Sequence, residues 1–285
     1  MNQPRVITAL ITPFFNGKLD VEGLKANIAY QLENGIEGIL VLGTTGEAPT
    51  LTKDERKIVI ETAVKSVSGR ALVFVGTGTN GTESTIEQTN EAQALGADVA
   101  LVVTPYYNCP MQEGIYDHFS AISHTTKIPI CLYHIPKRTG CYVTVDTLIK
   151  IATLPRIIGI KEASGDLNQA ARLLKELNIM VWGGDDTLTL PIMSLGGRGI
   201  ISVASNLIPH KIKALVDAAA HQDFETARHL FFDILPLLNA LFIETNPIPI
   251  KAAMEMSGMA AGPCRLPLGA MHEENRKKLS GIIYG

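Results

Sequence analysis

Cysteine is scarce in this 285-residue sequence, and its placement excludes several kinds of site. Cys109, Cys131, Cys141 and Cys264 are scattered without a CxxC pair, so neither a disulfide framework nor a zinc ribbon is expected. Cys131 lies inside an apolar run, where a free thiol packs as a small hydrophobic group. This usage is typical of a reducing compartment. Because the N-terminal segment also has no signal-peptide core or cleavage site, we expect a cytoplasmic protein.

Long apolar runs, excess positive charge and histidine clusters are also missing. No stretch approaches the roughly 18 apolar residues that span a bilayer, so no membrane partner is expected. The 25 Lys and Arg residues against 28 Asp and Glu give a net charge of -3, which provides no basic surface for nucleic acid. The seven histidines form neither HExxH nor another metal-ligand spacing, so no metal is expected. Small molecules are the expected partners.

Two motifs resemble ligand sites but lack the context that those sites need. "GTGTNG" (76–81) fits the G-x-G-x-x-G dinucleotide fingerprint, whose ribose-binding acid closes the following strand about 20 residues on. Here Asp98 opens that strand instead, so nicotinamide and flavin binding are rejected. In "GGDD" (183–186), Asp185 and Asp186 are expected to cap a helix that begins near Thr187 rather than to bind a metal.

Short apolar, β-branched runs recur about every 30 residues with amphipathic stretches between them, the pattern of repeated βα units and a parallel sheet. Each run is almost continuously hydrophobic, as a strand covered on both faces must be. Eight units within about 220 residues predict a closed eight-stranded parallel (β/α) barrel, with an open doubly wound sheet as the alternative. The predicted strands are 6–12, 38–43, 71–76, 99–104, 128–133, 157–161, 179–184 and 199–204.

The remainder of the sequence is helical in pattern. After residue 205, "PHKIKALVDAAAHQDFETARHLFFDILPLLNALF" has apolar residues at helical spacing, and "PIPIKAAMEMSG" adds another candidate helix. We therefore predict a barrel over 1–223 that carries the active site, and a C-terminal helical appendage over 224–285. No low-complexity linker separates the two, so the C-terminal helices are expected to pack on the barrel.

In a β/α barrel, the residues that follow the strands meet at one mouth, where the active site is built. Hydroxyls, phenols, an arginine and a lysine should meet there. Alone, each has an ordinary structural explanation, such as a turn-shaping threonine or a lysine that reaches water. Their convergence at one mouth favours a site instead. The strand-end residues are Thr44, Thr45, Tyr106, Tyr107, Tyr133, Arg138, Lys161, Ile201 and Ser202.

Lys161 ends the apolar run "IIGIK", where burying its charge without a partner is costly. An amine walled by apolar groups is neutral more readily, so it can attack a carbonyl and form a Schiff base. Tyr133, one strand away, is placed to donate and accept protons there. Arg138 and the backbone amides of the turn "GTTGE" would bind carboxylates. No cofactor is expected, because a protonated imine is itself an electron sink.

Six motifs together resemble those of a known family. The chain is similar over essentially its whole length to the dihydrodipicolinate synthases, which belong to the pyruvate-dependent class I aldolases together with N-acetylneuraminate lyase. Six spaced motifs make the resemblance highly specific. The motifs are "GTTGE" (43–47), "TPYYN" (104–108), "YHIPKRTG" (133–140), "GIKEASGD" (159–166), "GGRGIISV" (196–203) and "NPIPIK" (246–251).

The resemblance implies a catalytic role for four residues. Lys161 resembles the Schiff-base lysine that binds pyruvate, and Tyr133 resembles the proton donor and acceptor. Thr44 and Tyr107 correspond to the rest of the proton relay, with Tyr107 inserted into the site of a neighbouring subunit. The implied reaction is the condensation of pyruvate with L-aspartate 4-semialdehyde, the first committed step toward diaminopimelate and lysine.

The resemblance also implies how the substrates are bound. Thr45 and the backbone of Ile201 match the contacts to the pyruvate carboxylate, and Arg138 matches the arginine that binds the carboxylate of the aldehyde. A homotetramer, built as a dimer of dimers, is implied as well. Arg138 is the main discriminator within the family, because acetylneuraminate lyases lack an arginine in this segment.

The chain departs from the family pattern beside the site and at the effector position. The synthases commonly read "YNVPSRTG", so His134 and Lys137 are substitutions that should alter loop contacts without loss of the mechanism. Lysine-inhibited synthases have an acidic residue at the position of Ser84 and histidines at those of Lys53 and Arg56. Weak or absent feedback by lysine is therefore expected.

Two other functions stay open. A sibling aldolase, such as N-acetylneuraminate lyase or a 2-keto-3-deoxy sugar acid aldolase, would share Lys161 and Tyr133 but would not need Arg138. A barrel that binds a keto acid as a sensor would have no use for the proton relay of Thr44, Tyr107 and Tyr133.

Overall fold

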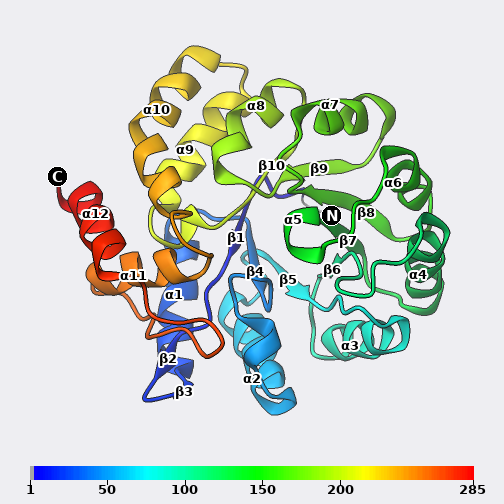
Figure 1. Cartoon of the computed structure of the whole chain (residues 1–285), viewed down its shortest axis with the longest axis horizontal. Coiled ribbons are helices and arrows are strands. Elements are labelled where there is room, and N and C mark those ends of the chain that lie inside the picture. Colours follow the sequence, from blue (N-terminus) through cyan, green and yellow to red (C-terminus); the bar gives the residue numbers. More distant parts are fainter. Residues whose placement is uncertain (1–2) are drawn as a thin grey trace.

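The computed structural model describes residues 3–285, which form a closed barrel of eight parallel strands surrounded by helices (Figure 1). Neighbouring strands follow the order β1-β10-β9-β8-β7-β6-β5-β4, and β4 pairs with β1 to close the barrel. The predicted barrel is confirmed, and the open sheet is excluded. The strands are β1 Val6–Ala9, β4 Gly38–Val41, β5 Leu72–Gly76, β6 Val99–Val103, β7 Ile130–His134, β8 Ile157–Glu162, β9 Met180–Gly183 and β10 Gly199–Ser202.

Helices follow the strands and cover their outer face (Figure 1). The Asp20 side chain caps the first of them by accepting from Gly23 N, and Thr52 forms a capping box with Glu55 at the start of the second. A small hairpin of β2 Phe14–Phe15 and β3 Lys18–Leu19 precedes the first helix. The barrel helices are α1 Val21–Glu33, α2 Lys53–Val67, α3 Thr82–Ala94, α4 Gln112–Thr125, α6 Val145–Ala152, α7 Leu167–Glu176, α8 Thr189–Ser194 and α9 Pro209–Ala220.

Side chains fill the barrel interior. Phe74 and Trp182 meet edge to face with ring centres 6.2 Å apart, and Trp182 Nε1 donates to Pro4 O, just before β1. These rings fill the N-terminal side of the barrel, which leaves its C-terminal mouth for Tyr133 and other polar groups. The interior cluster consists of Ile7, Ala9, Leu40, Phe74, Val99, Leu101, Cys131, Tyr133, Trp182 and Ile201.

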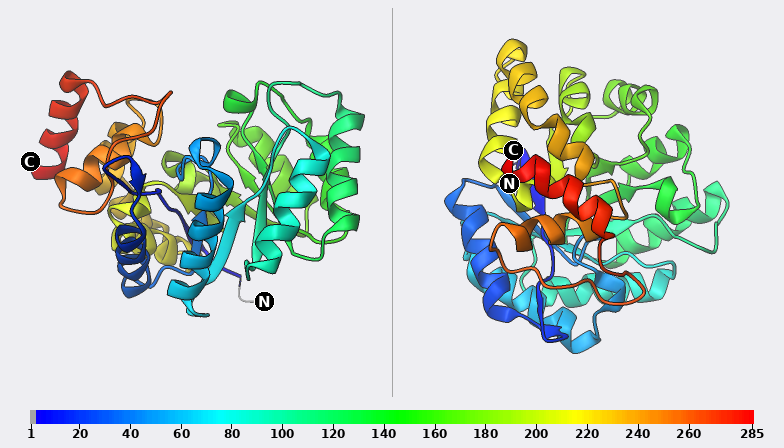
Figure 2. Two further views of the ribbon diagram at one scale, coloured as in Figure 1. Left: turned by 90° about the horizontal axis from the view of Figure 1, so that it is seen from below. Right: turned by 60° about the vertical axis from the view of Figure 1, so that its left-hand side comes forward.

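Three helices follow the barrel and lie against one side of it (Figure 2): α10 Phe224–Ala240, α11 Ile248–Met256 and α12 Glu273–Tyr284. Phe231, Ile250 and Leu279 of these helices belong to the same hydrophobic cluster as Val6 of β1, so the helices share a core with the barrel. The division into 1–223 and 224–285 stays a prediction. Neither these helices nor any other within residues 3–285 combine the length and apolar character needed to cross a membrane.

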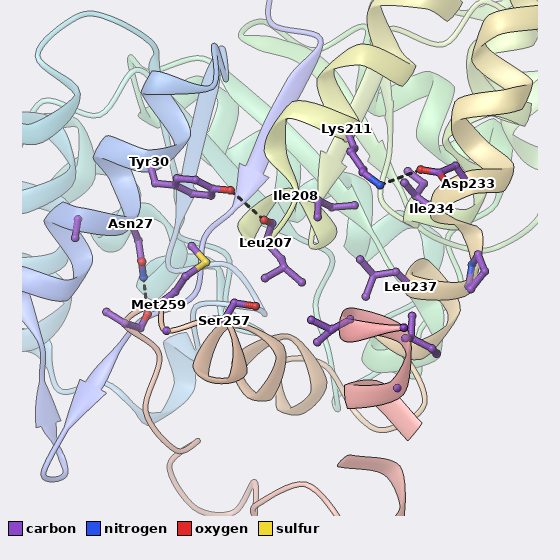
Figure 3. Close-up of a pocket in the computed structure, with 18 residues that line it drawn as sticks. Asn27, Tyr30, Leu207, Ile208, Lys211, Asp233, Ile234, Leu237, Ser257 and Met259 are labelled. Carbon is purple, nitrogen blue, oxygen red and sulfur yellow. Dashed lines mark hydrogen bonds and ion pairs between the residues drawn. The ribbon is translucent and has the colours of Figure 1, made fainter. Parts of the chain in front are cut away.

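A cavity of about 760 Å³ lies along the seam between the barrel helices and the C-terminal helices (Figure 3). Near it, Tyr30 Oη donates to Leu207 O at 3.2 Å, and Lys211 Nζ pairs with Asp233 at 2.9 Å. None of the site residues predicted from the sequence lines this cavity, so it is separate from the barrel mouth.

Candidate active site

Lys161 and Tyr133 lie side by side at the C-terminal end of the barrel. The β7–β8 register pairs them directly, and Lys161 Nζ lies 4.4 Å from the centre of the Tyr133 ring. Each residue is only 5% exposed, and no salt bridge within residues 3–285 includes Lys161. Burial raises the pKa of the neighbouring Cys131 to about 12, so this thiol stays protonated and does not compete as a nucleophile.

The turn after β4 brings Thr44 and Thr45 to the same end of the barrel. Glu47 N donates to Thr44 O at 3.1 Å, which closes the turn. Gly76 of β5 permits this approach, because a Cβ there would lie 2.0 Å from Leu42 O. Thr44 is half-buried and Thr45 is buried, as expected for groups that line a barrel mouth.

Glu47 holds this turn against the C-terminal region. Its Oε1 lies 2.7 Å from Lys251 Nζ of α11, and its Oε2 accepts from Arg265 N at 2.9 Å. The two paired side chains are 0% and 2% exposed, and Lys251 Nζ also donates to Thr12 O at 3.0 Å. Burial lowers the pKa of Lys251, although Glu47 acts in the opposite direction. The motifs "GTTGE" and "NPIPIK" contain the two partners, but nothing local in the sequence indicates that they meet.

Asn246 connects the two regions predicted to bind carboxylates. Its Nδ2 donates to Thr45 Oγ1 at 3.0 Å, and its backbone O accepts from Arg138 Nη2 at 2.9 Å. Arg138 extends from the short helix α5 Pro136–Thr139 and is exposed, so its guanidinium is open to a ligand. Sequence reasoning assigned no role to Asn246, and its place in the motif "NPIPIK" is the only signal that could have found it.

Tyr107 and Ile201 occupy different environments from the buried pair. Tyr107 is 88% exposed, adopts φ 74°, and donates its backbone N–H to Thr139 O at 3.1 Å. A single chain therefore does not bring the Tyr107 phenol into the buried site. Ile201 is the next-to-last residue of β10, where it pairs with Ile7 in the barrel wall and is fully buried.

The acidic pair after β9 has two separate roles. Asp185 Oδ1 accepts from Thr187 N at 3.0 Å, as expected for a helix cap. The same expectation was wrong for Asp186, which is fully buried and accepts from Val203 N and Ala204 N at 2.9 and 3.2 Å. Burial raises the pKa of Asp186 even though these bonds oppose the shift. Asp186 thus anchors the backbone that follows β10. Within residues 3–285, no group of three or more His, Cys, Asp or Glu is arranged to hold a metal ion.

Comparison with known proteins confirms the resemblance over nearly the whole chain. The profile of the Dihydrodipicolinate synthetase family matches residues 2–284. The 4-hydroxy-tetrahydrodipicolinate synthase of Protochlamydia amoebophila is 50% identical over 282 residues, which cover 97% of this chain and 94% of that protein. Dihydrodipicolinate synthase from Aquifex aeolicus is 45% identical with a TM-score of 0.96, covering 98% of this chain and 97% of that one. The chloride-inhibited dihydrodipicolinate synthase from Acinetobacter baumannii, complexed with pyruvate, is 38% identical with a TM-score of 0.97, covering 99% and 98%.

Likeness of this extent in both sequence and fold places the chain among the lyase-type barrel enzymes. The chain belongs to the dihydrodipicolinate synthetase family. Because several relatives that match it over nearly their full length are 4-hydroxy-tetrahydrodipicolinate synthases, that activity is favoured over the activity of a sibling aldolase.

Proposed function

We propose that the protein is a 4-hydroxy-tetrahydrodipicolinate synthase that condenses pyruvate with L-aspartate 4-semialdehyde through an imine on Lys161. The observation that carries this proposal is the buried contact between Lys161 Nζ and Tyr133 at the barrel mouth. In the proposed reaction, the neutral amine attacks C2 of pyruvate to give a carbinolamine, which takes up a proton and loses water to give a protonated imine. Loss of a methyl proton then gives an enamine, which attacks the aldehyde carbon of the second substrate.

The other residues at the mouth have roles that fit their chemistry. Tyr133 moves protons at the reacting carbon, with Thr44 and Tyr107 completing the relay. Thr45 and the backbone of Ile201 bind the pyruvate carboxylate. The reaction needs no external cofactor, because the imine accepts the electron pair that is released when the methyl proton leaves.

Arg138 binds the carboxylate of the semialdehyde through its two-pronged guanidinium. Its exposure supports this role, as does the fact that within residues 3–285 its guanidinium makes one bond, to Asn246 O, which leaves four of its five N–H groups for a ligand. A sugar aldehyde has no carboxylate at this position, so the arginine distinguishes the two substrate classes.

The working form that we propose is a cytoplasmic homotetramer in which Tyr107 completes the site of a neighbouring subunit. Exposure of Tyr107 at 88% and of Met111 at 77% supports a partner surface on this side of the barrel. The free thiols of Cys109 and Cys141 support a reducing compartment.

Weak feedback by lysine stays a prediction. Ser84 Oγ lies 2.6 Å from Thr79 Oγ1, the Arg56 guanidinium donates to the Gln88 side chain, and Lys53 is exposed. None of these three side chains is a carboxylate, so none of them can pair with the ammonium group of a bound lysine. Inhibition of the purified protein by micromolar L-lysine would contradict this expectation.

The proposed function is tested by measuring pyruvate consumption with either L-aspartate 4-semialdehyde or N-acetylmannosamine in parallel reactions. Consumption with the semialdehyde alone is expected. Consumption with the sugar alone would assign the chain to a sibling activity, and consumption with neither would favour the keto-acid sensor.

A further inference from the structure

His134 is the last residue of β7 and lies directly behind the proposed catalytic pair. It follows Tyr133 in the strand, just as Glu162 follows Lys161 in β8, and the register pairs His134 with Glu162. Because side chains alternate along a strand, Tyr133 and Lys161 point into the barrel while His134 and Glu162 point outward under the helices. His134 is 0% exposed and Glu162 is 2% exposed.

Three groups surround the His134 ring. Nδ1 lies 3.3 Å from Glu162 Oε2, and Nε2 lies 3.3 Å from Val143 N. The side-chain nitrogen of Gln169 in α7 lies 2.9 Å from Nδ1 and donates to Glu162 Oε2 at 3.0 Å. Burial alone would raise the pKa of Glu162. Hydrogen bonds from His134 and Ser164 outweigh this effect and hold the pKa below its usual value, so the carboxylate is ionised.

The bond from Val143 N indicates one tautomer of His134. A backbone N–H can only donate, so the Nε2 that faces Val143 N must accept. With the ring proton on Nδ1, the Glu162 carboxylate can accept it at 3.3 Å, and the Gln169 amide nitrogen, 2.9 Å from Nδ1, donates to Glu162 instead of to the ring. His134 thus links a carboxylate on β8 to a backbone N–H in the segment beyond α5.

The bond to Val143 closes a loop that carries a proposed substrate-binding residue. The segment 135–142 leaves the barrel at His134, contains Arg138, and returns to the imidazole of the same histidine at Val143. Tyr142 Oη donates to Gln169 Oε1 at 2.6 Å, which ties the end of the loop to the same cluster. Arg138 is therefore carried by a loop whose two ends are joined through the side chain of His134, and this closure helps to fix the position of the Arg138 backbone.

We propose that His134 is a positioning residue that sets Arg138 by closing the loop 135–142 through Val143, and so determines the affinity for the semialdehyde carboxylate. This inference rests on the proposed function. It assigns His134 no contact with either substrate.

A pair of variants separates the two bonds of His134. In His134→Asn the side-chain amide can still reach Glu162 but is too short for Val143, whereas in His134→Gln the terminal amide oxygen can replace Nε2 as an acceptor. For the Asn variant, we expect the KM for the semialdehyde to rise about fivefold, the effect of one lost hydrogen bond. The KM for pyruvate and the trapping of the imine by borohydride should stay unchanged, and the Gln variant should restore most of the lost affinity.

A double-mutant cycle with Arg138→Ala tests whether the effect passes through the arginine. If it does, His134→Asn adds nothing to the KM for the semialdehyde in the Arg138→Ala background. Additive effects, or equal rises in the KM values of both substrates, would overturn the proposal. If His134→Asn does not fold, His134→Ser, whose short side chain also offers no acceptor within reach of Val143 N, carries the test, and an unchanged KM for the semialdehyde in that variant would overturn the proposal. A wild-type protein that does not consume the semialdehyde refutes the proposed function instead, so the two failures are distinguishable.

Discussion

The buried ion pair of Glu47 and Lys251 makes the strongest prediction about stability. Replacing Lys251 by Met removes the ion-pair partner of the Glu47 carboxylate, whose side chain is 0% exposed, and leaves the backbone N–H of Arg265 and the Cys264 thiol as its hydrogen-bond partners. Removing one member of a buried pair costs about 3–5 kcal/mol, because the remaining charge has neither water nor a counterion. We expect the free energy of unfolding of Lys251→Met, measured by urea denaturation, to fall by that amount.

Two further variants test this reasoning. In Glu47→Gln/Lys251→Met the buried charge is gone, so the loss should be smaller than in Lys251→Met alone. Lys211→Met is the matched control, since Lys211 and Asp233 are 2.9 Å apart, close to the 2.7 Å between Lys251 and Glu47, but are 45% and 62% exposed. This exposed pair should contribute less than about 1 kcal/mol. A loss below about 1 kcal/mol for Lys251→Met, no greater than for the control, would refute the assignment of an uncompensated charge to Glu47.

Further predictions concern the reaction and the pH dependence of the protein's stability. Tyr133→Phe should still bind pyruvate but turn over about 10²- to 10⁴-fold more slowly, measured as pyruvate consumption; unchanged turnover would exclude Tyr133 from the relay. Arg138→Ala should raise the KM for the semialdehyde at least about tenfold, whereas Lys137→Ala, its exposed neighbour, should leave it unchanged. Burial lowers the pKa of His118 from 6.5 to about 4 in the folded protein, so unfolding takes up a proton within that pH range. The contribution of His118 to the free energy of unfolding is complete above pH 6.5 and should fall by about 2 kcal/mol by pH 5, measured by denaturation at each pH. In His118→Gln, the free energy of unfolding should decline less over this range, because that part of the pH dependence is lost.

The barrel could be predicted because its strands are covered on both faces. Runs such as "VALVVT" are continuously apolar for this reason, and their ends place Lys161 and Tyr133 at one mouth. The same logic predicted the turn with Thr44 and Thr45. These features depend on local pattern and on a rule that holds for the whole fold class.

The supports of the site could not be predicted, because they join residues that are distant in sequence. Asn246 contacts Thr45 across 201 positions, and Glu47 contacts Lys251 across 204. His134 stands in a motif that was recognised, yet its buried bond to Glu162 depends on the register of two strands. The role of Tyr107 stays a prediction, since its exposed phenol has no site to enter within one chain.

The imine on Lys161 is the central claim, and reductive trapping tests it most directly. The purified protein is incubated with pyruvate, reduced with borohydride, digested and mapped by mass spectrometry, with Lys161→Arg treated in parallel. We predict one reduced pyruvate adduct, located on Lys161 and lacking in the variant. An adduct on another lysine, or turnover of the semialdehyde by Lys161→Arg at the wild-type rate, would contradict the account.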